Sequence, residues 1–279
     1  MNEIVATQNL APSIKMLEIA APSIAAKWRA GQFVILRAHE RGERIPLTVA
    51  KVNPDTGIIT LVVQEVGYTT RLLGGLQRGH SMVDLVGPLG KPSEIERFGQ
   101  VVVVGGGVGT AVAYPEAKAL KEAGNRLISI IGFRNKDLVI FEDELKTVSD
   151  RLFVATDDGS KGHHGFVSDV LKQLIEDGTH IDRVFASGPA IMMKVISELT
   201  RPYRIKTMVS LNPIMVDGTG MCGACRVSIG RQTKFACVDG PSFDGHEVDF
   251  DQLIARLRMY LEQEKQIVAC GSGCSREHA

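Results

Sequence analysis

The sequence predicts a multidomain β plus α/β fold: an N-terminal antiparallel β-barrel, a central parallel-sheet α/β domain, and a small C-terminal domain with a helix. Short apolar runs separated by turn residues fill residues 1–97, whereas strand and helix patterns alternate over 98–210. The third observation is that every cysteine of the chain lies within 211–279. We therefore expect three domains with these limits.

The first region has the pattern of many short strands. Apolar runs at Phe33–Leu36 and Ile59–Val63 are separated by turn residues at 53–57 and 87–90. Few stretches have a helical period. Regularly spaced short strands of this kind are typical of a barrel or a sandwich.

The second region begins with Val101–Val104, an apolar run without polar alternation, as expected for a strand buried on both faces. A helical stretch follows from about Tyr114 to Ala123, with Pro115 expected in its first turn. Further strand runs are Leu127–Gly132, Leu152–Thr156 and Arg183–Ala186, and further helical segments are near Phe141–Val148, Gly165–Ile175 and Ala190–Leu199. This alternation predicts a parallel sheet covered on both faces.

The third region is rich in Gly and Cys and then becomes helical. Arg226–Ile229, a Gly230-Arg231 turn and Gln232–Ala236 predict a hairpin that returns the chain to the preceding loop. Apolar residues then recur at helical spacing, a stripe that we expect to pack against the rest of the protein: Leu253, Ile254, Leu257 and Leu261.

Charge and composition exclude several classes of protein. Lys plus Arg and Asp plus Glu both number 32, so neither nucleic acid nor an anionic membrane surface is expected as a partner. The apolar runs are too short to span a bilayer. The start, Met1-Asn2-Glu3, lacks the basic region and apolar stretch of a signal peptide, so we expect a cytoplasmic protein.

A glycine cluster follows the first buried strand of the central region and precedes a helix. Such a turn lets a pyrophosphate approach backbone N–H groups at the helix N-terminus. The strict dinucleotide fingerprint is only partly met, because its third glycine falls on Thr110 and its acidic ribose ligand is replaced by Phe133-Arg134. A sharp turn without a ligand is the alternative. The nucleotide-binding candidates of this turn are Gly105, Gly107, Val108, Gly109 and Thr110.

Three other turns follow predicted strands and would lie at the carboxyl edge of the same sheet, where open α/β folds bind ligands. Arg134-Asn135-Lys136 would lie near an adenosine ribose, and on charge alone would favour NADP(H). The other two turns fit either ligand binding or an ordinary chain reversal, and their candidate residues are Asp157, Asp158, Gly159, Gly188 and Pro189.

The spacing Asp217-x4-Cys222-x2-Cys225-x11-Cys237 is the sharpest signal. It resembles the plant-type ferredoxin run of 2Fe–2S ligands, with Asp in the first place. An odd number of crowded cysteines does not suit a disulfide framework. A structural zinc site with the same ligands is the alternative, although only one closely spaced pair is present. Cys270 and Cys274 form a looser pair, which we expect to be free thiols or a tail contact.

Two segments of the first region resemble the FAD-binding signature of the ferredoxin–NADP reductase superfamily: Arg44-Ile45-Pro46-Leu47-Thr48 and Gly67-Tyr68-Thr69-Thr70. The resemblance implies that Arg44 contacts the FAD pyrophosphate and that Gly67 and Thr70 hold phosphate. It also implies that Thr48, next to Pro46 and Leu47, contacts the isoalloxazine ring.

The order of these motifs over the whole chain is similar to two members of that superfamily. One is the electron-transfer subunit of dihydroorotate dehydrogenase, and the other is the small subunit of the electron-bifurcating NADH-dependent ferredoxin–NADP oxidoreductase. The former family has four cysteines, whereas the latter has Asp plus three cysteines, as found here. The sequence departs from the wider pattern at Ser187, where a cysteine is often found, and at the C-terminus, which lacks an aromatic residue.

The second resemblance implies an oxidoreductase with FAD and a 2Fe–2S cluster as cofactors and NAD(H) as substrate. It implies a heterodimer with a larger FAD/4Fe–4S subunit, through which the chain would communicate with ferredoxin. The cofactors would carry the chemistry, so no acid–base catalytic residue is nominated. The alternatives are the dihydroorotate dehydrogenase subunit and, outside the enzymes, a zinc-stabilised nucleotide-binding module.

Overall fold

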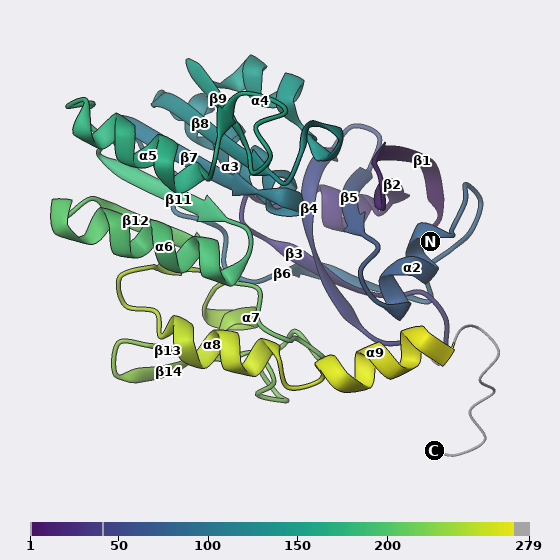
Figure 1. Cartoon of the computed structure of the whole chain (residues 1–279). Coiled ribbons are helices and arrows are strands. Elements are labelled where there is room, and N and C mark those ends of the chain that lie inside the picture. Colours follow the sequence, from purple (N-terminus) through teal and green to yellow (C-terminus); the bar gives the residue numbers. More distant parts are fainter. Residues whose placement is uncertain (1, 41, 271–279) are drawn as a thin grey trace.

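A computed structural model describes residues 2–40 and 42–270 of the chain. Figure 1 shows a twisted barrel built from the N-terminal strands beside a layered α/β unit, with the C-terminal helices running beneath both. Among the helices of the described residues, none is both long enough and apolar enough to cross a membrane.

The N-terminal part is the predicted antiparallel barrel. Its strands are β1 (Ile4–Ala11), β2 (Ile14–Ala20), β3 (Phe33–Arg37), β4 (Ile45–Asn53), β5 (Ile58–Gln64) and β6 (Asp84–Leu89). They form one sheet in the order β1-β2-β5-β4-β3-β6. An antiparallel bridge between Glu3 and Ser81 brings the chain just before β6 to the start of β1, which curls the sheet on itself. Two short helices, α1 (Pro22–Ala25) and α2 (Tyr68–Gly74), pack on β5.

The central part is a seven-stranded sheet in the order β10-β9-β8-β7-β11-β12-β15. Its strands are β7 (Gln100–Gly106), β8 (Arg126–Phe133), β9 (Arg151–Thr156), β10 (His163–His164), β11 (Arg183–Ser187), β12 (Lys206–Ser210) and β15 (Ser242–Asp244). All pairings are parallel except that of β12 with β15. Residues beyond 211 therefore contribute an antiparallel edge strand to this sheet, and the domain limits proposed from the sequence stay a prediction.

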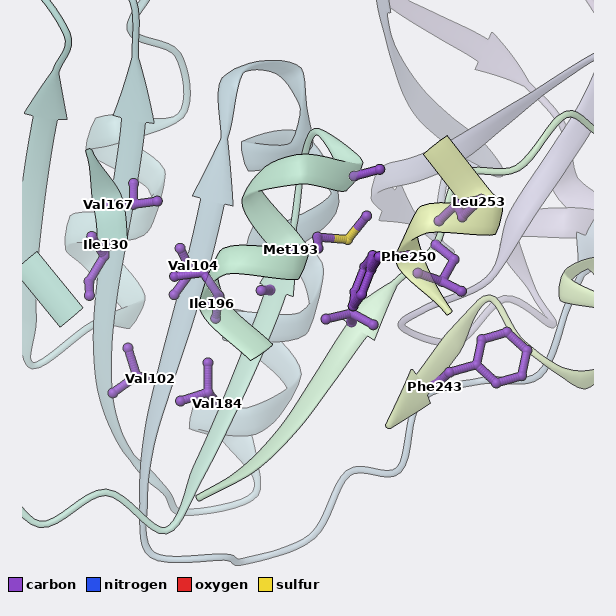
Figure 2. Packing of buried hydrophobic residues seen from close by; sticks show 14 of the residues in the cluster. Val102, Val104, Ile130, Val167, Val184, Met193, Ile196, Phe243, Phe250 and Leu253 are labelled. Carbon is purple, nitrogen blue, oxygen red and sulfur yellow. The ribbon is translucent and has the colours of Figure 1, made fainter. Parts of the chain in front are cut away.

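Helices cover both faces of this sheet, as predicted. The helices α3 (Thr110–Glu122) and α4 (Glu142–Val148) pack on one face, through apolar residues such as Ala117, Leu120 and Leu145. The helices α5 (Val167–Glu176) and α6 (Ala190–Thr200) pack on the other. Figure 2 shows Val102, Val104 and Ile130 of the strands against the side chains of these helices. Short 3-10 helices lie at Gly107–Gly109, Lys136–Leu138 and Arg201–Tyr203.

The last part contains the predicted hairpin, β13 (Arg226–Ile229) with β14 (Gln232–Phe235), followed by α7 (Ala236–Asp239), α8 (Phe250–Leu257) and α9 (Leu261–Cys270). Phe250 and Leu253 of α8 join the core under α6 (Figure 2), and α9 reaches α2 of the barrel (Figure 1). Cys274 lies outside the described residues.

Two expectations for the helices are wrong. The helix expected from Tyr114 starts at Thr110, directly after the glycine turn, so Pro115 lies inside it. Because proline has no N–H, it cannot donate the intrahelical bond that the Ala111 carbonyl would otherwise accept. The apolar stripe expected on a single helix is divided between two helices, since α8 ends at Leu257 and α9 starts at Leu261. Leu261 is 41% exposed.

Candidate functional site

Two turns meet where the strand order of the central sheet reverses. The chain proceeds from β7 to β8 and β9 on one side and is continued by β11 and β12 on the other. Gly105 at the end of β7 is directly opposite Ser187 at the end of β11. Such a switch point is where open α/β sheets bind ligands. The glycine turn and the Ser187-Gly188-Pro189 turn, both predicted from the sequence, are therefore brought together.

The glycines of these turns allow close packing at some positions and leave open space at others. A Cβ atom at Gly109 would lie 2.6 Å from the Gly188 Cα atom, so the two turns touch through their backbones. At Gly107, with φ of +54°, a Cβ atom would meet no heavy atom within 4 Å, so this residue faces open space. Because Gly107 also lines the cleft described below, a ligand there can approach its backbone, as pyrophosphate binding requires.

Gly105 and Thr110 make a structural contact instead of facing the open space. A Cβ atom at Gly105 would lie 2.9 Å from the Thr110 Cα atom, so glycine is needed for α3 to begin this close to β7. The Thr110 hydroxyl is buried and has no hydrogen-bond partner within the protein. Because Thr110 is fully buried against Gly105 and does not line the cleft, its hydroxyl is not open to a ligand there.

A cleft of about 890 Å³ lies over these turns, and residues of all three parts of the chain line it. The sequence-predicted site residues on its walls are Pro46, Leu47, Thr48, Gly107, Val108, Gly109, Arg134, Asp157, Gly188 and Pro189. The predicted flavin and nucleotide residues outside its lining are Arg44, Gly67, Thr70, Gly105, Thr110, Asn135, Asp158 and Gly159, and the four predicted cluster ligands also lie outside it.

The barrel segments around Arg44 and Thr70 are linked through their neighbours. The buried Thr69 hydroxyl donates a hydrogen bond to the Glu43 carboxylate, which joins α2 to the start of β4. The Thr70 hydroxyl accepts hydrogen bonds from the N–H groups of Val66 and Gly67, at 3.0 and 2.9 Å. These bonds satisfy donors at the start of α2 and fix the loop before it.

Arg44 has an incompletely used guanidinium group. Its Nη2 atom lies 3.6 Å from the Asp84 carboxylate, which is engaged more closely by Arg37 at 2.6 Å. The Arg37 hydrogen bond, with a further contribution from Arg44, holds the pKa of Asp84 below its usual range. The Arg44 side chain is 43% exposed and so retains donors for an anionic ligand.

The far end of the cleft carries charges of both signs. The side chains of Arg134 and Asp157 are both exposed there. Asn135 instead caps a 3-10 helix, with its side-chain oxygen 3.1 Å from the Asp137 N atom. Hydrogen bonds from Ser160 hold the pKa of Asp158 below its usual range, so this carboxylate is occupied within its own turn.

The acid–cysteine loop brings part of the predicted ligand set together. Cys225 and Cys237 are buried with their Sγ atoms 3.1 Å apart, whereas Cys222 is exposed. Backbone hydrogen bonds at Ala224 and Asp217 hold the pKa of Cys222 below its usual range. Asp217 accepts hydrogen bonds from the N–H and hydroxyl groups of Thr219. No three His, Cys, Asp or Glu side chains converge as a metal site within residues 2–40 and 42–270.

The loop backbone nevertheless fits an iron–sulfur cluster. Gly218, Gly220 and Gly223 have φ values of +86°, +88° and +67°, a region that side chains strongly disfavour. Left-handed residues at short intervals in a loop can turn backbone N–H groups toward one concave side, where cluster sulfides accept hydrogen bonds. Thiolates are the usual ligands of such a cluster, and a carboxylate can replace one of them with the same charge. The residues that would hold it are Asp217, Cys222, Cys225 and Cys237.

This loop is seated on the barrel through a second glycine contact. A Cβ atom at Gly218 would lie 2.9 Å from side-chain atoms of both Ile35 and Leu89, on β3 and β6. Met215, two residues before Asp217, lines the cleft together with Pro241, four residues after Cys237. The segment that carries the predicted cluster ligands therefore also forms a wall of the cleft.

Several residues that line the cleft were not predicted from the sequence. Met215 and Pro241 lie in the cysteine-rich region and gave no separate signal. Phe166 and Ile191 also line the cleft, with 62% and 60% of their surface exposed. Each stands within three residues of a glycine that ends a strand-edge turn, Gly165 and Gly188. Phe166 and Ile191 could have been identified from one pattern: an apolar residue in the first turn of a helix that follows such a glycine.

Comparisons with known proteins agree with this architecture. Residues 212–249 match the family model of the iron–sulfur cluster binding domain of dihydroorotate dehydrogenase B. A Thermotoga maritima protein described as a homologue of the dihydroorotate dehydrogenase B (NAD(+)) electron transfer subunit is 52% identical, over 95% of this chain and 93% of its own length.

Solved structures give the same picture. A chain from the structure of NADH-dependent reduced ferredoxin–NADP oxidoreductase is 51% identical and superposes with a TM-score of 0.92, covering 97% of both chains. A ferredoxin–NADP⁺ reductase from Neisseria gonorrhoeae is 19% identical with a TM-score of 0.59, covering 75% of this chain and 96% of its own, and shows the fold alone.

The fold is that of ferredoxin–NADP reductases with an added iron–sulfur domain. The relatives that share about half of its sequence define the chain as an electron-transfer subunit of an oxidoreductase. Within this class, the chain belongs to the family of dihydroorotate dehydrogenase B electron-transfer subunits and their homologues, which includes the matching chain of NADH-dependent reduced ferredoxin–NADP oxidoreductase. The flavin and iron–sulfur cofactors predicted from the sequence agree with this family.

Proposed function

We propose that this chain exchanges hydride with NAD(H) at a bound FAD and single electrons, through a 2Fe–2S cluster, with a larger iron–sulfur flavoprotein. One observation carries the proposal: a single cleft is walled by Leu47 and Thr48 of the barrel, by the glycine turn, and by Met215 of the segment that leads to Asp217. Flavin, nucleotide and cluster would thus share one site.

The barrel residues would bind the flavin. Arg44 retains free donors for the pyrophosphate, and the Glu43–Thr69 bond keeps it near the Gly67–Thr70 turn, whose backbone would hold phosphate. Pro46, Leu47 and Thr48 would lie along the isoalloxazine ring, where the Thr48 hydroxyl can donate or accept a hydrogen bond. When bound, a flavin supplies the conversion between two-electron and one-electron transfer.

The central sheet would bind the nicotinamide nucleotide. The backbone of Gly107 and the start of α3, which border the cleft, would accept the pyrophosphate, and Thr110 would hold the start of α3 close to β7. Gly188 and Pro189 would border the nicotinamide, and Arg134, Asn135, Asp157, Asp158 and Gly159 would surround the adenosine end. No residue of this chain needs to move a proton in the transfer.

The exposed face of the cysteine loop suits a redox partner. Cys222 is exposed, and Met221, Val216 and Val238 around it expose 87%, 50% and 36% of their surface. Apolar side chains at the edge of a redox loop favour protein contact over solvent. We propose that the larger subunit of a heterodimer docks there and connects the cluster with ferredoxin.

The finer choice is an electron-bifurcating NADH-dependent ferredoxin–NADP oxidoreductase. Asp217 in place of a fourth cysteine supports it, as does the 51% identity to a chain of that enzyme. The alternative is the electron-transfer subunit of dihydroorotate dehydrogenase, supported by the match of residues 212–249. We also propose that residues 1–97, 98–210 and 211–279 act as the flavin, nucleotide and cluster domains.

Anaerobic purification tests the proposal. We expect bound flavin near 450 nm, iron and acid-labile sulfide in equal amounts, and bleaching on addition of NADH. A colourless protein containing zinc would refute it and support a nucleotide-binding module. The copurifying chain separates the two enzymes: a larger iron–sulfur flavoprotein supports bifurcation, and a pyrimidine-synthesis dehydrogenase contradicts it.

A further inference from the structure

A charged and aromatic contact joins the barrel to two helices that cover one face of the central sheet, α3 and α4. The Lys51 Nζ atom, on β4, lies 2.8 Å from the Glu144 Oε1 atom on α4. The same Nζ atom lies 5.0 Å from the centre of the Phe141 ring and 5.7 Å from that of Tyr114. Both distances are within the range of cation–π attraction. A cation from the first region thus rests between a carboxylate and two rings of the second.

The partners on the α/β side are ordered among themselves. The rings of Tyr114 and Phe141 are 5.4 Å apart and inclined by 53°, a tilted aromatic pair. Phe141 is buried, and its carbonyl oxygen accepts the first hydrogen bond of α4, from the Leu145 N–H group at 3.0 Å. Lys51 and Glu144 are each about one-third exposed, at 34% and 35%.

Phe141 has an unusual backbone conformation. Its φ of +59° and ψ of +18° lie in the left-handed region, which is uncommon for a bulky side chain without a local polar bond. Residues are kept in such conformations only where the surroundings over-determine them. Here the ring is held by Tyr114 and Lys51, so the contact across the two regions helps to set the direction in which α4 starts.

Lys51 and Tyr114 of this contact lie on two of the elements that line the cleft, β4 and α3. On β4, Lys51 is three residues after Thr48, which lines the cleft. On α3, Tyr114 is one helical turn after Ala111, which also lines it. Apolar residues of both regions continue the contact, since Ala50 and Val62 of the barrel share a core with Phe141 and Leu145. A tilt at Lys51 would therefore change the separation of the two walls.

We propose that Lys51, Tyr114, Phe141 and Glu144 form an interdomain latch that sets the orientation of the nucleotide-binding sheet against the flavin-binding barrel. The inference rests on the proposed function, since the latch would fix the positions of β4 and α3, which line the cleft where flavin and nicotinamide would bind. The latch residues are positioning residues: they touch neither ligand site and act through β4 and α3. Hydride transfer needs the reacting atoms near 3–3.5 Å apart, so a small tilt is costly.

The test compares Lys51→Met, Lys51→Arg, Glu144→Gln and the exchanged pair Lys51→Glu/Glu144→Lys in the full-length holoprotein. The matched control is Lys121→Met, which breaks an ion pair of 2.6 Å with Asp150 inside the α/β region, at similar exposure. Anaerobic stopped-flow measures the limiting rate of flavin reduction and the NADH dissociation constant separately. Amide exchange is followed in peptides 45–53 and 138–148, and flavin and iron contents are determined for each variant.

We expect Lys51→Met to lower the limiting rate on the order of tenfold, with little change in the NADH dissociation constant, and to speed exchange in both peptides. Lys51→Arg and the exchanged pair should recover most of the rate, and Lys121→Met should change neither rate nor exchange in these peptides. A Lys51→Met rate within twofold of the wild type, or a slow rate with unaltered exchange, would overturn the latch.

Failure of the proposed function gives a different result. If the wild-type chain binds no flavin or is not reduced by NADH, the hydride-transfer function is wrong. The latch is then tested by amide exchange alone. Equal protection of both peptides in the wild type and in Lys51→Met would overturn it. Faster amide exchange that is confined to Lys51→Met and Glu144→Gln would support it.

Discussion

Glu116 accepts a hydrogen bond from the Ser93 hydroxyl inside the protein, where only 1% of the Glu116 surface is exposed. Glu116 lies on α3, and Ser93 lies in the segment that connects the barrel to the central sheet. The Ser93 N–H group in turn donates to the Ala30 carbonyl at 2.9 Å. A buried carboxyl group thus fastens the interdomain segment to the helix that begins at the glycine turn.

Burial raises the pKa of Glu116 from its ordinary 4.5 to about 7, although the Ser93 hydrogen bond acts in the opposite direction. The folded protein therefore holds this proton more tightly than the unfolded chain does. Between these pKa values the folded state binds more protons, so the free energy of unfolding falls as pH rises. This contribution is complete below about pH 4.5 and is lost as pH passes through about 7.

We predict that Glu116→Gln flattens this pH dependence. In the wild type the free energy of unfolding should fall by up to about 3 kcal/mol between pH 5 and 8. The amide of Gln does not titrate, so in the variant this pH-dependent loss should be absent. Denaturant unfolding at several pH values measures the difference. Glu122→Gln, an exposed change on the same helix, is the control and should keep the wild-type slope. Parallel curves for wild type and Glu116→Gln would contradict the prediction.

Local patterns predicted the elements well because their physical causes are local. The uninterrupted Val101–Val104 run could only be a strand buried on both faces, and it is β7 at the centre of the sheet. The turn at Gly230-Arg231 determined the register of the hairpin in which Arg226 pairs with Phe235. Strong turn residues and apolar periodicity leave few alternatives for such segments.

Long-range contacts could not be predicted in the same way. Pro115 favoured a helix start at about Tyr114, which the packing of Gly105 against Thr110 moves four residues earlier. Ser242–Asp244 joins the central sheet because the edge of β12 is free to pair with it, and no local signal marks this. Met215 reaches the cleft through the seating of Gly218 on the barrel, a contact between residues far apart in sequence.

The cluster ligands can be tested one by one. We predict that Cys222→Ala or Cys225→Ala abolishes the 2Fe–2S signal while FAD stays bound, because each removes one thiolate from a four-ligand set. Electron paramagnetic resonance of the reduced protein and iron and sulfide analysis measure the loss. Cys270→Ala, outside the predicted set, is the control. Unchanged iron and sulfide in the first two variants would refute the assignment.

Asp217 gives a complementary test with a positive outcome. Asp217→Cys replaces one anionic ligand by another of similar reach, so we expect a cluster to remain, with an altered spectrum. Asp217→Ala removes the charge and the ligand, so the cluster should become labile. If Asp217→Ala and the wild type retain iron equally well during chelator treatment, Asp217 is not a ligand.

Arg44 is expected to contribute to FAD binding. Arg44→Ala should weaken retention by about 2 kcal/mol, roughly thirtyfold in affinity, through the loss of a charge-assisted contact with phosphate. Flavin release during dialysis, followed by fluorescence, measures the effect. Arg78→Ala removes an exposed barrel arginine outside the cleft and serves as the control. Equal retention by both variants would remove Arg44 from the flavin site.

The last prediction concerns the choice between NADH and NADPH. Arg134 and Lys136 follow β8, and on charge alone they would favour the 2′-phosphate of NADPH. Asp157, at the end of β9, brings a carboxylate to the same end of the cleft as Arg134. A carboxylate there repels a 2′-phosphate and can accept a hydrogen bond from a free ribose hydroxyl, as in NAD-binding sites. The resemblance to the bifurcating small subunit also implies NAD(H).

We therefore predict faster flavin reduction by NADH than by NADPH, measured on the complex with a partner variant that binds no nucleotide. Asp157→Asn should reduce this preference on the order of tenfold, because a like-charge repulsion worth roughly 1.4 kcal/mol is removed. Asp143→Asn, at a 93% exposed side chain on α4, is the matched control. Faster reduction of the wild type by NADPH would instead make Arg134 and Lys136 phosphate ligands, and Arg134→Ala should then abolish that advantage.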